Sequence, residues 1–450
     1  MTRGDGQIGY TDVDNVVIRA LARPGALFWL LLGFFATGVA AGAATWAYQI
    51  YTGLGVTGLR QPTMWAVYIT NFVFWVGIGH AGTLISAILY LFRSRWRTPV
   101  YRAAETMTIF AIATAGLFPL VHLGRVWWFY WLLPYPNERW LQPNFRSPLV
   151  WDAFAVGTYF TVSCIFYFIG LMPDAAAARD GMVGWRRKFY AFLSLGWQGS
   201  EAQWRHFSTV YLLLAGFITP LVLSVHSVVS WDFAMAQVPG WHSTIFAPYF
   251  VAGAIFSGCA MVITLLVPVR RFLRLEETLT PWHFDNLAKL TLAMSLVVTY
   301  SYAAESFMNW YAADPYERVT FHMRYFGSTY GFLFWITIAC NSVIPLVLFS
   351  RRVRRSVVAL WIVALFINVG MWTERYMIIA GSLATAFEPS QWAYHRPTWV
   401  EVVITGASFC WLLMWFTLFT KLVPVVSMTE VKEGLPWLRQ ALRDQRREAA

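Results

Sequence analysis

The sequence FPLVHLGRVWWFYWLLPYPNERWLQPNFRSPLVWDAF, residues 118–154, joins two strongly apolar runs and carries polar residues where each run ends. His122 and Arg125 lie near the end of the first run, and Asp152 lies just inside the second. An antiparallel helical hairpin would bring His122 and Asp152 to one face of a membrane. Ionisable side chains in such a place are costly and mark functional sites. We therefore interpret this hairpin as the centre of a candidate site.

Composition places the chain among polytopic membrane proteins. Of its 450 residues, 58% are hydrophobic and 13% are charged, which leaves too little polar surface for a soluble protein. Ten apolar runs are each long enough to cross about 30 Å of hydrocarbon at about 1.5 Å per residue. The predicted fold class is an all-α integral membrane protein. We predict spans at residues 25–50, 63–92, 102–130, 149–172, 207–231, 245–268, 286–311, 327–350, 356–381 and 398–422.

The basic residues predict the orientation of these spans. Together with both tails, alternate loops on one side hold 26 of the 34 Lys and Arg residues, and loops rich in these residues stay in the cytoplasm. Both termini are therefore expected in the cytoplasm. This bias also explains the formal charge of +11, so nucleic acid is not an expected partner. Residues 10–22 predict a helix on the membrane surface, and the first apolar run has no signal-peptide features and should remain as a span.

A weak internal duplication divides the chain. Residues 72–97 resemble residues 250–272, each run ending in a basic loop, and the next spans end in GRVWWFY (124–130) and ESFMNWY (305–311). Two related four-helix bundles would follow, although any two Leu-rich spans that end in Arg look alike. The predicted parts are an N-terminal segment with an interfacial helix (1–24), a first flanking span (25–62), a first four-helix bundle (63–244), a second four-helix bundle (245–396), a last flanking span (397–424) and a cytoplasmic tail (425–450).

Helix direction converts sequence position into depth and places several polar side chains in the outer third of the membrane. His122, Asp152 and His226 share this depth, and Asp232 follows His226 at the outer rim. A histidine can take a proton from a quinol near neutral pH, and a carboxylate near the surface can relay it outward. We predict that these four residues are catalytic; the alternative is that they only hold helices together. Arg125 could pair with Asp152 or Asp232. The residues predicted to bind the quinol are Arg125, Trp151, Ser227 and Trp231.

A second polar set lies in the predicted second bundle. Adjacent Glu374 and Arg375 are expected to point to different faces. Pairs such as Glu305 with Arg375, or Glu374 with Arg324, would be structural, whereas a carboxylate without a fixed cation could carry protons. The sequence leaves both open. His80 stands apart, deeper in the second span, as a core residue or one step of a proton wire. The candidate proton path is His80, Glu305, Asn309, Asn341, Glu374 and Arg375, with the hydroxyls of Tyr300 and Tyr302.

Cofactor motifs are missing from the sequence. It has no CxxCH, no cysteine cluster and no nucleotide loop, and its four cysteines fall in four different apolar runs. Haem ligation in a membrane needs two histidines at matching depth, and only His122 and His226 share a depth in this interpretation. We expect no haem or metal bound by this chain itself, so its redox partner should be another protein.

The chain resembles the NrfD/polysulfide-reductase family of membrane subunits. Three features carry the resemblance: the ten spans in two bundles; FPLVHLGR (118–125) followed by SPLVWDAFAVGTYF (147–160); and HSVVSWDFAMAQVPGWHSTIFAPYFVAGAIFSG (226–258). The resemblance covers nearly the whole chain. Its flanking spans and the motif from Trp231 to Tyr249 are similar to the ActC membrane protein of bacterial alternative complex III, a quinol:electron-acceptor oxidoreductase.

This resemblance implies a menaquinol site at the outer side of the first bundle, on the four predicted catalytic residues. It also implies a bacterial inner membrane and three kinds of partner: an iron-sulfur protein, a multihaem cytochrome c and a second NrfD-like membrane subunit. The cytoplasmic loop at 173–206 and the tail after Pro424 are expected to contact other subunits. Related proteins serve polysulfide and nitrite-type reductases, some of which run quinone chemistry in the other direction. A proton-coupled transporter or a structural anchor are the alternatives from other classes.

Overall fold

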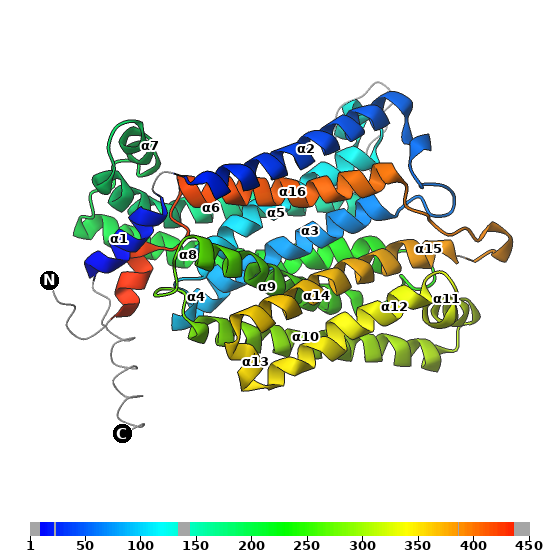
Figure 1. Ribbon diagram of the computed structural model, residues 1–450. Coiled ribbons are helices and arrows are strands. Elements are labelled where there is room, and N and C mark those ends of the chain that lie inside the picture. The colour runs from blue at the N-terminus through cyan, green and yellow to red at the C-terminus, as the bar shows by residue number, and fades with distance from the viewer. Residues whose placement is uncertain (1–9, 22–23, 134–144, 386, 436–450) are drawn as a thin grey trace.

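The computed structural model is a bundle of roughly aligned helices (Figure 1). It describes residues 10–21, 24–133, 145–385 and 387–435, and none of these forms a strand. Ten helices in the described residues are long and apolar enough to cross a membrane, which confirms the predicted fold class. They are α2 (Ala26–Thr52), α3 to α4 (Val67–Leu91), α5 (Tyr101–His122), α6 (Pro148–Gly181), α8 (Glu201–Ala234), α9 (Phe246–Phe272), α10 (Pro281–Ala312), α12 to η6 (Gly331–Phe349), α14 to α15 (Val357–Ala384) and α16 (Trp399–Leu422).

Helix α5 is shorter than its apolar run. The predicted span 102–130 is wrong at its outer end, because the α-helix stops at His122 and Gly124 takes a left-handed conformation with φ of 70°. Glycine adopts this conformation without the cost that a Cβ imposes. The apolar residues that follow form a short 3-10 helix, η4 (Val126–Leu132). Hydropathy alone could not separate these two segments.

The cytoplasmic connection predicted as a loop at 173–206 is mostly helical. Helix α6 continues to Gly181, α7 spans Trp185–Leu193 and α8 begins at Glu201. Ser200 and Gln203 form a capping box that fixes the start of α8. On the opposite side, α11 (Pro315–Phe326) occupies a connection for which no helix was predicted. Helices α7 and α11 are amphipathic and too short to span a membrane.

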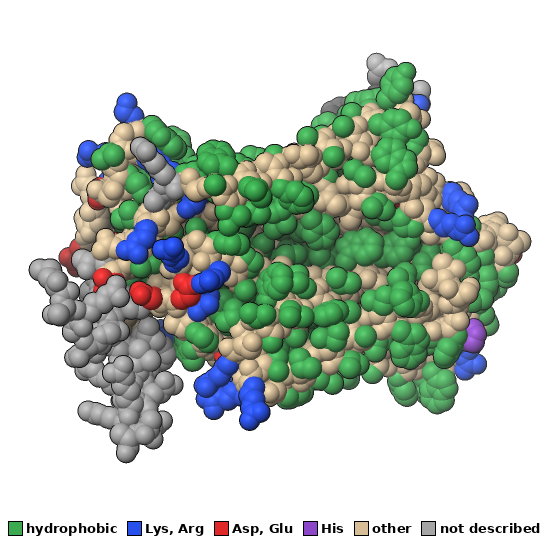
Figure 2. Space-filling view, in the orientation of Figure 1, with side chains coloured by type: hydrophobic (Ala, Val, Ile, Leu, Met, Phe, Trp, Pro, Cys, Tyr) green, Lys and Arg blue, Asp and Glu red, His purple; other side chains and the backbone are tan. Residues whose placement is uncertain are grey.

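Charged side chains mark the two ends of the bundle, and apolar side chains cover the surface between them (Figure 2). Helix α1 (Tyr10–Ala20) and the segment that follows α16 lie at the same end (Figure 1). The predicted helix near the N-terminus is thereby confirmed. Residues 436–450, which include most of the predicted cytoplasmic tail, lie outside the described residues. The internal repeat and the assignment of this end to the cytoplasm remain predictions.

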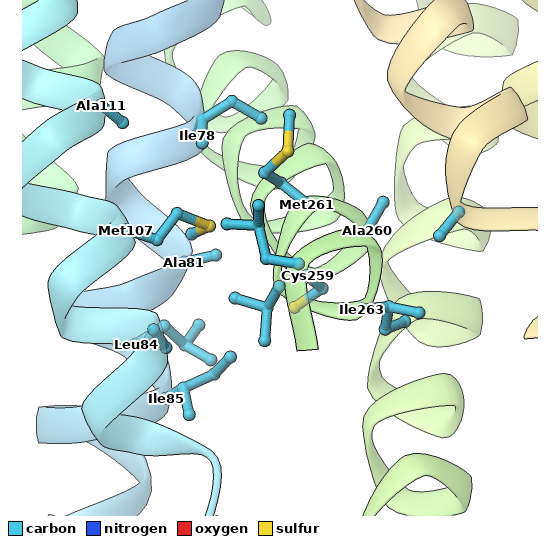
Figure 3. Close-up of a cluster of buried hydrophobic side chains, with 14 of the residues drawn as sticks. Ile78, Ala81, Leu84, Ile85, Met107, Ala111, Cys259, Ala260, Met261 and Ile263 are labelled. Carbon is cyan, nitrogen blue, oxygen red and sulfur yellow. The ribbon is translucent and has the colours of Figure 1, made fainter. Parts of the chain in front are cut away.

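Helices α3 and α9 form the core of the bundle. The most apolar stretch of each is 78% buried, whereas that of α2 is only 6% buried. Figure 3 shows how apolar side chains of α3, α5 and α9 meet in this core. Gly258 permits the close approach of α9 to α3, because a Cβ built on it would lie 2.8 Å from the carbonyl oxygen of Ile78. The side chains labelled in Figure 3 are Ile78, Ala81, Leu84, Ile85, Met107, Ala111, Cys259, Ala260, Met261 and Ile263.

A buried arginine connects the start of α5 and the second half of α6 to the segment that follows α16. Arg102 is fully buried and donates to the Gly170 carbonyl at 2.6 Å and to Asp174 at 3.0 Å. The other carboxylate oxygen of Asp174 accepts the backbone N–H of Thr429 at 3.0 Å. Arg97 pairs with Glu430 at 2.7 Å. These contacts fix the segment after α16 against the first bundle.

We expect Gly258→Ala to destabilise the purified protein, because the added methyl group must displace backbone atoms of α3. Overpacking of this kind costs about 1–3 kcal/mol. Gly216→Ala on α8 is the matched control, since a Cβ there meets no atom within 4 Å. Thermal unfolding in detergent checks both variants. Equal melting temperatures for the two would show that α3 and α9 do not pack as described.

Candidate functional site

Two carboxyl groups lie together at one end of the first bundle. Asp152 is near the start of α6 and Asp232 is in the last turn of α8, so the antiparallel packing of these helices brings them together. The two carboxyl groups are neighbours. Asp152 is only 6% exposed, and its two oxygens have no other hydrogen-bond partner within the described residues. A pair of this kind can hold one proton between its oxygens, because two adjacent like charges are unfavourable in an apolar environment.

Aromatic side chains flank the carboxyl pair. Trp151 and Trp231, each the neighbour in sequence of one aspartate, meet edge to face with ring centroids 6.0 Å apart. The indole N–H of Trp151 donates to the Phe145 carbonyl at 2.6 Å, which fixes that ring. Trp231 is 36% exposed. Ser227, the other predicted quinol contact on α8, donates its hydroxyl to the Leu223 carbonyl of its own helix.

His226 belongs to a different group from the one predicted. Its ring lies against the ring of His80, with centroids 4.6 Å apart, and both residues are buried. The interpretation of His80 as separate from His226 is therefore wrong, as is the statement that only His122 shares the depth of His226. One reason is that α8 continues to Ala234, three residues past its predicted end, which places His226 deeper.

The imidazole pair has unused hydrogen-bonding capacity. Neither ring nitrogen of His226 has a partner within the described residues, and the same holds for Nε2 of His80. Nδ1 of His80 lies 2.5 Å from the Val76 carbonyl. Tyr159, which the sequence reasoning missed, stacks on His80 with centroids 5.1 Å apart and donates its hydroxyl to the Gly79 carbonyl at 3.1 Å. Its position on α6 gave no signal that separated it from an ordinary core tyrosine.

His122 is the last residue of α5 and is half-buried. Its Nδ1 atom is buried and has no hydrogen-bond partner in the described part of the chain. Within the described residues, no hydrogen bond, ion pair or ring contact joins His122 to the carboxyl pair or to His226. Arg125 is exposed and, among the described residues, forms no ion pair with Asp152 or Asp232, so that predicted pairing is wrong. The helix ends before Arg125, so this residue does not share a helix face with His122.

The second bundle holds its glutamates in ion pairs, but not in the pairs that the sequence suggested. Arg324 Nη1 lies 3.1 Å from Glu305, and Arg375 Nη1 lies 2.9 Å from Glu374. Glu374 contacts Tyr302 and Asn341, whereas Arg375 lies against Phe250 on α9, although the ends of the two side chains meet. All four side chains of the two ion pairs are at most 9% exposed. An ion pair is the usual way to bury such groups, because an unpaired charge in an apolar interior is far more costly.

Glu374 is also part of a hydrogen-bonded cluster. The Tyr302 hydroxyl donates to Glu374, and the Asn341 amide donates to both, at 2.9 Å to the hydroxyl and 3.3 Å to the carboxylate. Tyr300, which was expected beside Tyr302, is 69% exposed and lies outside this cluster. Asn341 is in a π-helical turn of its span, η5 (Ala339–Val343). Such turns are frequent at functional sites.

One aromatic ring separates this cluster from the histidine pair. The Arg375 guanidinium lies 4.1 Å from the ring centroid of Phe250 on α9, and the Phe250 and His226 rings are 6.0 Å apart. Phe250 therefore lies where the polar groups of the two bundles come closest. The sequence did not indicate this role for Phe250, because α9 reads as a uniformly apolar helix.

Glu305 borders two cavities. A cavity of about 620 Å³ is lined by Glu305 and Asn309 on α10, by Glu317 on α11 and by His242 in the connection between α8 and α9. A second, of about 20 Å³, is lined by Glu305, Tyr302 and Arg324; a volume above roughly 10–15 Å³ accepts a water molecule. Burial raises the pKa of Glu317, which accepts the Gly240 N–H at 2.8 Å.

Possible metal ligands do not gather anywhere in the described residues: no group of three or more His, Cys, Asp or Glu side chains is arranged to hold a metal ion there. The four cysteines are free thiols, with Cys259 and Cys340 buried and the others partly buried.

Comparison with known proteins gives the family. The model of the family "Polysulphide reductase, NrfD" matches residues 55–387. A putative membrane subunit of dimethyl sulfoxide reductase from Halobacterium salinarum is 27% identical over 402 residues, covering 83% of this chain and 86% of that protein. A subunit of selenate reductase from Mesobacillus selenatarsenatis is 21% identical over 417 residues, covering 89% and 94%. An Hdr-like menaquinol oxidoreductase integral membrane subunit from Archaeoglobus fulgidus is 23% identical over 303 residues, covering 67% and 66%.

The fold and the site define a polytopic membrane protein with buried ionisable groups in two helical regions. The chain belongs to the NrfD polysulphide reductase family, which confirms the resemblance found in the sequence. The relatives described above are all named as subunits of reductases or oxidoreductases, and those from Halobacterium and Archaeoglobus are named as membrane subunits.

Proposed function

We propose that this chain is the quinol-binding membrane subunit of a multi-subunit quinol:electron-acceptor oxidoreductase of the alternative complex III type. It lies in a bacterial inner membrane with both termini in the cytoplasm, and it oxidises menaquinol near the outer face. The observation that carries this proposal is the carboxyl pair of Asp152 and Asp232. Asp152 is buried and Asp232 is partly buried; the pair has no cation beside it within the described residues and is flanked by two tryptophans. The name of the Archaeoglobus relative, a menaquinol oxidoreductase subunit, agrees with quinol as substrate.

Quinol oxidation releases two protons and two electrons, and this chain can supply acceptors for the protons. Nδ1 of His122 is free to accept a hydrogen bond from one quinol hydroxyl, and the imidazole can then take its proton. The carboxyl pair can take a proton and pass it to the outer surface. Trp151 and Trp231 offer flat apolar faces for a quinone ring. The electrons pass to iron-sulfur and haem groups of partner subunits on the outer side, alongside a second NrfD-like membrane subunit.

The same site also suits a complex with a different electron acceptor. Two relatives are named as reductase subunits, so a polysulfide- or nitrite-type reductase that draws electrons from quinol through other partners is the alternative. Both versions oxidise quinol at the same residues. A proton-coupled transporter is disfavoured, since the carboxyl pair lies at helix ends and not at a central substrate site.

Replacing His122 with Ala should lower quinol oxidation about 100-fold or more, the scale of a lost general base. Steady-state turnover of the purified complex measures this. His322→Ala is the control, because His322 on α11 is an exposed histidine outside the proposed site. Normal turnover in an assembled His122→Ala complex would rule out the proposed role.

Asp152→Asn keeps the size of the side chain and removes its ability to take a proton, so it should also slow quinol oxidation, by about 100-fold. Its pH–rate profile should lose the titration that depends on the carboxyl pair. Asp180→Asn, at the exposed far end of α6, should leave turnover unchanged. A wild-type pH–rate profile for Asp152→Asn would contradict an acid–base role.

A second role, proton transfer through the second bundle, is supported by the position of Glu305 between two cavities. Tyr302 lines the smaller cavity and donates to Glu374, so a chain of exchangeable protons would run from Glu374 through Tyr302 and Glu305 to the larger cavity. Asn309, Asn341 and Arg375 adjoin this route, whereas His80 lies beside His226 and outside it. The opposing view is that Arg324 and Arg375 hold both glutamates as fixed ion pairs in an inert scaffold.

Vesicles that contain the complex decide between these views. With transport, wild type should release more than the two protons that each quinol carries, and Tyr302→Phe should release only those two, because it lacks the bridging hydroxyl. Glu305→Gln should behave in the same way. Tyr300→Phe is the matched control, since Tyr300 is exposed. If wild type and all variants release two protons per quinol, the second bundle is a scaffold.

A further inference from the structure

An apolar groove lies outside the first bundle, where both flanking helices meet α5. It has a volume of about 230 Å³. Its walls extend over seven residue steps on α2, α5 and α16, or about 10 Å at 1.5 Å per residue. Ala43 on α2 is exposed at its edge, so the groove opens toward the lipid. The lining residues are Val39, Gly42, Ala43, Trp46, Thr114, Leu117, Phe118, Val121, Ile404, Ala407, Ser408 and Trp411.

The groove leads toward His122. Val121, which lines one end of the groove, is the residue before His122, and Phe118 lies one turn earlier on α5. Trp46 lines the same end of the groove on α2, and its indole N–H is buried without an acceptor in the described part of the chain. Nδ1 of His122 is likewise buried and without a partner there. The groove therefore ends at the unpaired indole N–H of Trp46 and at Val121, the neighbour in sequence of His122, which does not itself line the groove.

The shape and chemistry of the groove fit a branched hydrocarbon chain that ends in a polar ring. A cavity of about 150 Å³ with apolar walls already accepts benzene, so 230 Å³ has room for a branched segment of at least five carbons. The hydroxyls of Thr114 and Ser408 donate to carbonyls of their own helices, so neither needs a polar group of a ligand as a partner. Of the lining residues near His122, Trp46 is the one with an unsatisfied N–H, which suits an oxygen of the ring.

We propose that the groove between α2, α5 and α16 binds the isoprenoid tail of the quinol and leads its ring to His122. This proposal rests on the quinol oxidation proposed above and adds a route of entry. The two flanking helices, which are not part of either predicted four-helix bundle, then have a function: they form two walls of the tail site. The quinol enters sideways from the bilayer, past Ala43.

Filling the groove tests this. We compare two substrates in lipid vesicles that contain the whole complex: a naphthoquinol with an isoprenoid tail, and the same ring with a methyl group in place of the tail. Ala43→Phe and Val39→Phe should raise KM for the tailed quinol about 10-fold and leave kcat and the constants for the tail-less quinol within about twofold. Ala41→Phe is the control, because Ala41 lies exposed on the same helix, two residues from Ala43.

A second measurement does not depend on turnover. A tailed quinone with a photoreactive group in the tail should label α2 and α16 in wild type and in Ala41→Phe, and this labelling should be lost in Ala43→Phe. An unchanged KM together with unchanged labelling would overturn the proposal. So would labelling by a photoreactive phospholipid alone, which would identify a lipid site. If the tailed quinone labels the groove but neither quinol is oxidised, the proposed function fails and the tail site stands.

Discussion

The structure depends on how it satisfies polar groups that are removed from water. In hydrocarbon, an unpaired polar group costs several kcal/mol, so each buried one needs a partner or a function. At the end of the bundle that holds α1 and α7, the requirement is met by a network around Arg102, which is 0% exposed and donates to Asp174 and the Gly170 carbonyl. Asp174 in turn holds Thr429, so one buried arginine connects two helices and the end of the described chain. This cluster holds α5, α6 and the segment after α16 together.

The region between α3, α6 and α8 shows the opposite pattern. Asp152 and Asp232 lie against each other without a cation in the described residues, and His226 contacts His80 with both of its ring nitrogens unused there. Packing alone would not retain such groups, because apolar side chains of similar size would be more stable there. In the second bundle, by contrast, Glu305 and Glu374 each have an arginine. The difference explains why the proposed quinol chemistry belongs to the first bundle.

Hydropathy was enough to predict the ten spans, because each needs a long apolar run whatever its neighbours are. It failed where the run and the helix differ: Gly124 ends α5, but the apolar residues continue through η4. Counting residues from a helix end also brought Asp152 and Asp232 to one face. The contact of His80 with His226 could not be predicted, since it depends on how α3 and α8 are set against each other. The sequence also could not predict which arginine pairs with each glutamate, because several arginines lie at similar depth.

Phe250 lies near polar groups of both regions. Its ring lies between His226 and the guanidinium of Arg375, and it carries no proton that it could transfer. A continuous proton wire between the bundles is therefore interrupted at this residue. Coupling would instead be electrostatic: a proton gained by the histidine pair would repel Arg375 across one ring and weaken its hold on Glu374. Release of Glu374 from Arg375 would then leave its carboxylate, already bonded to Tyr302, free to take a proton.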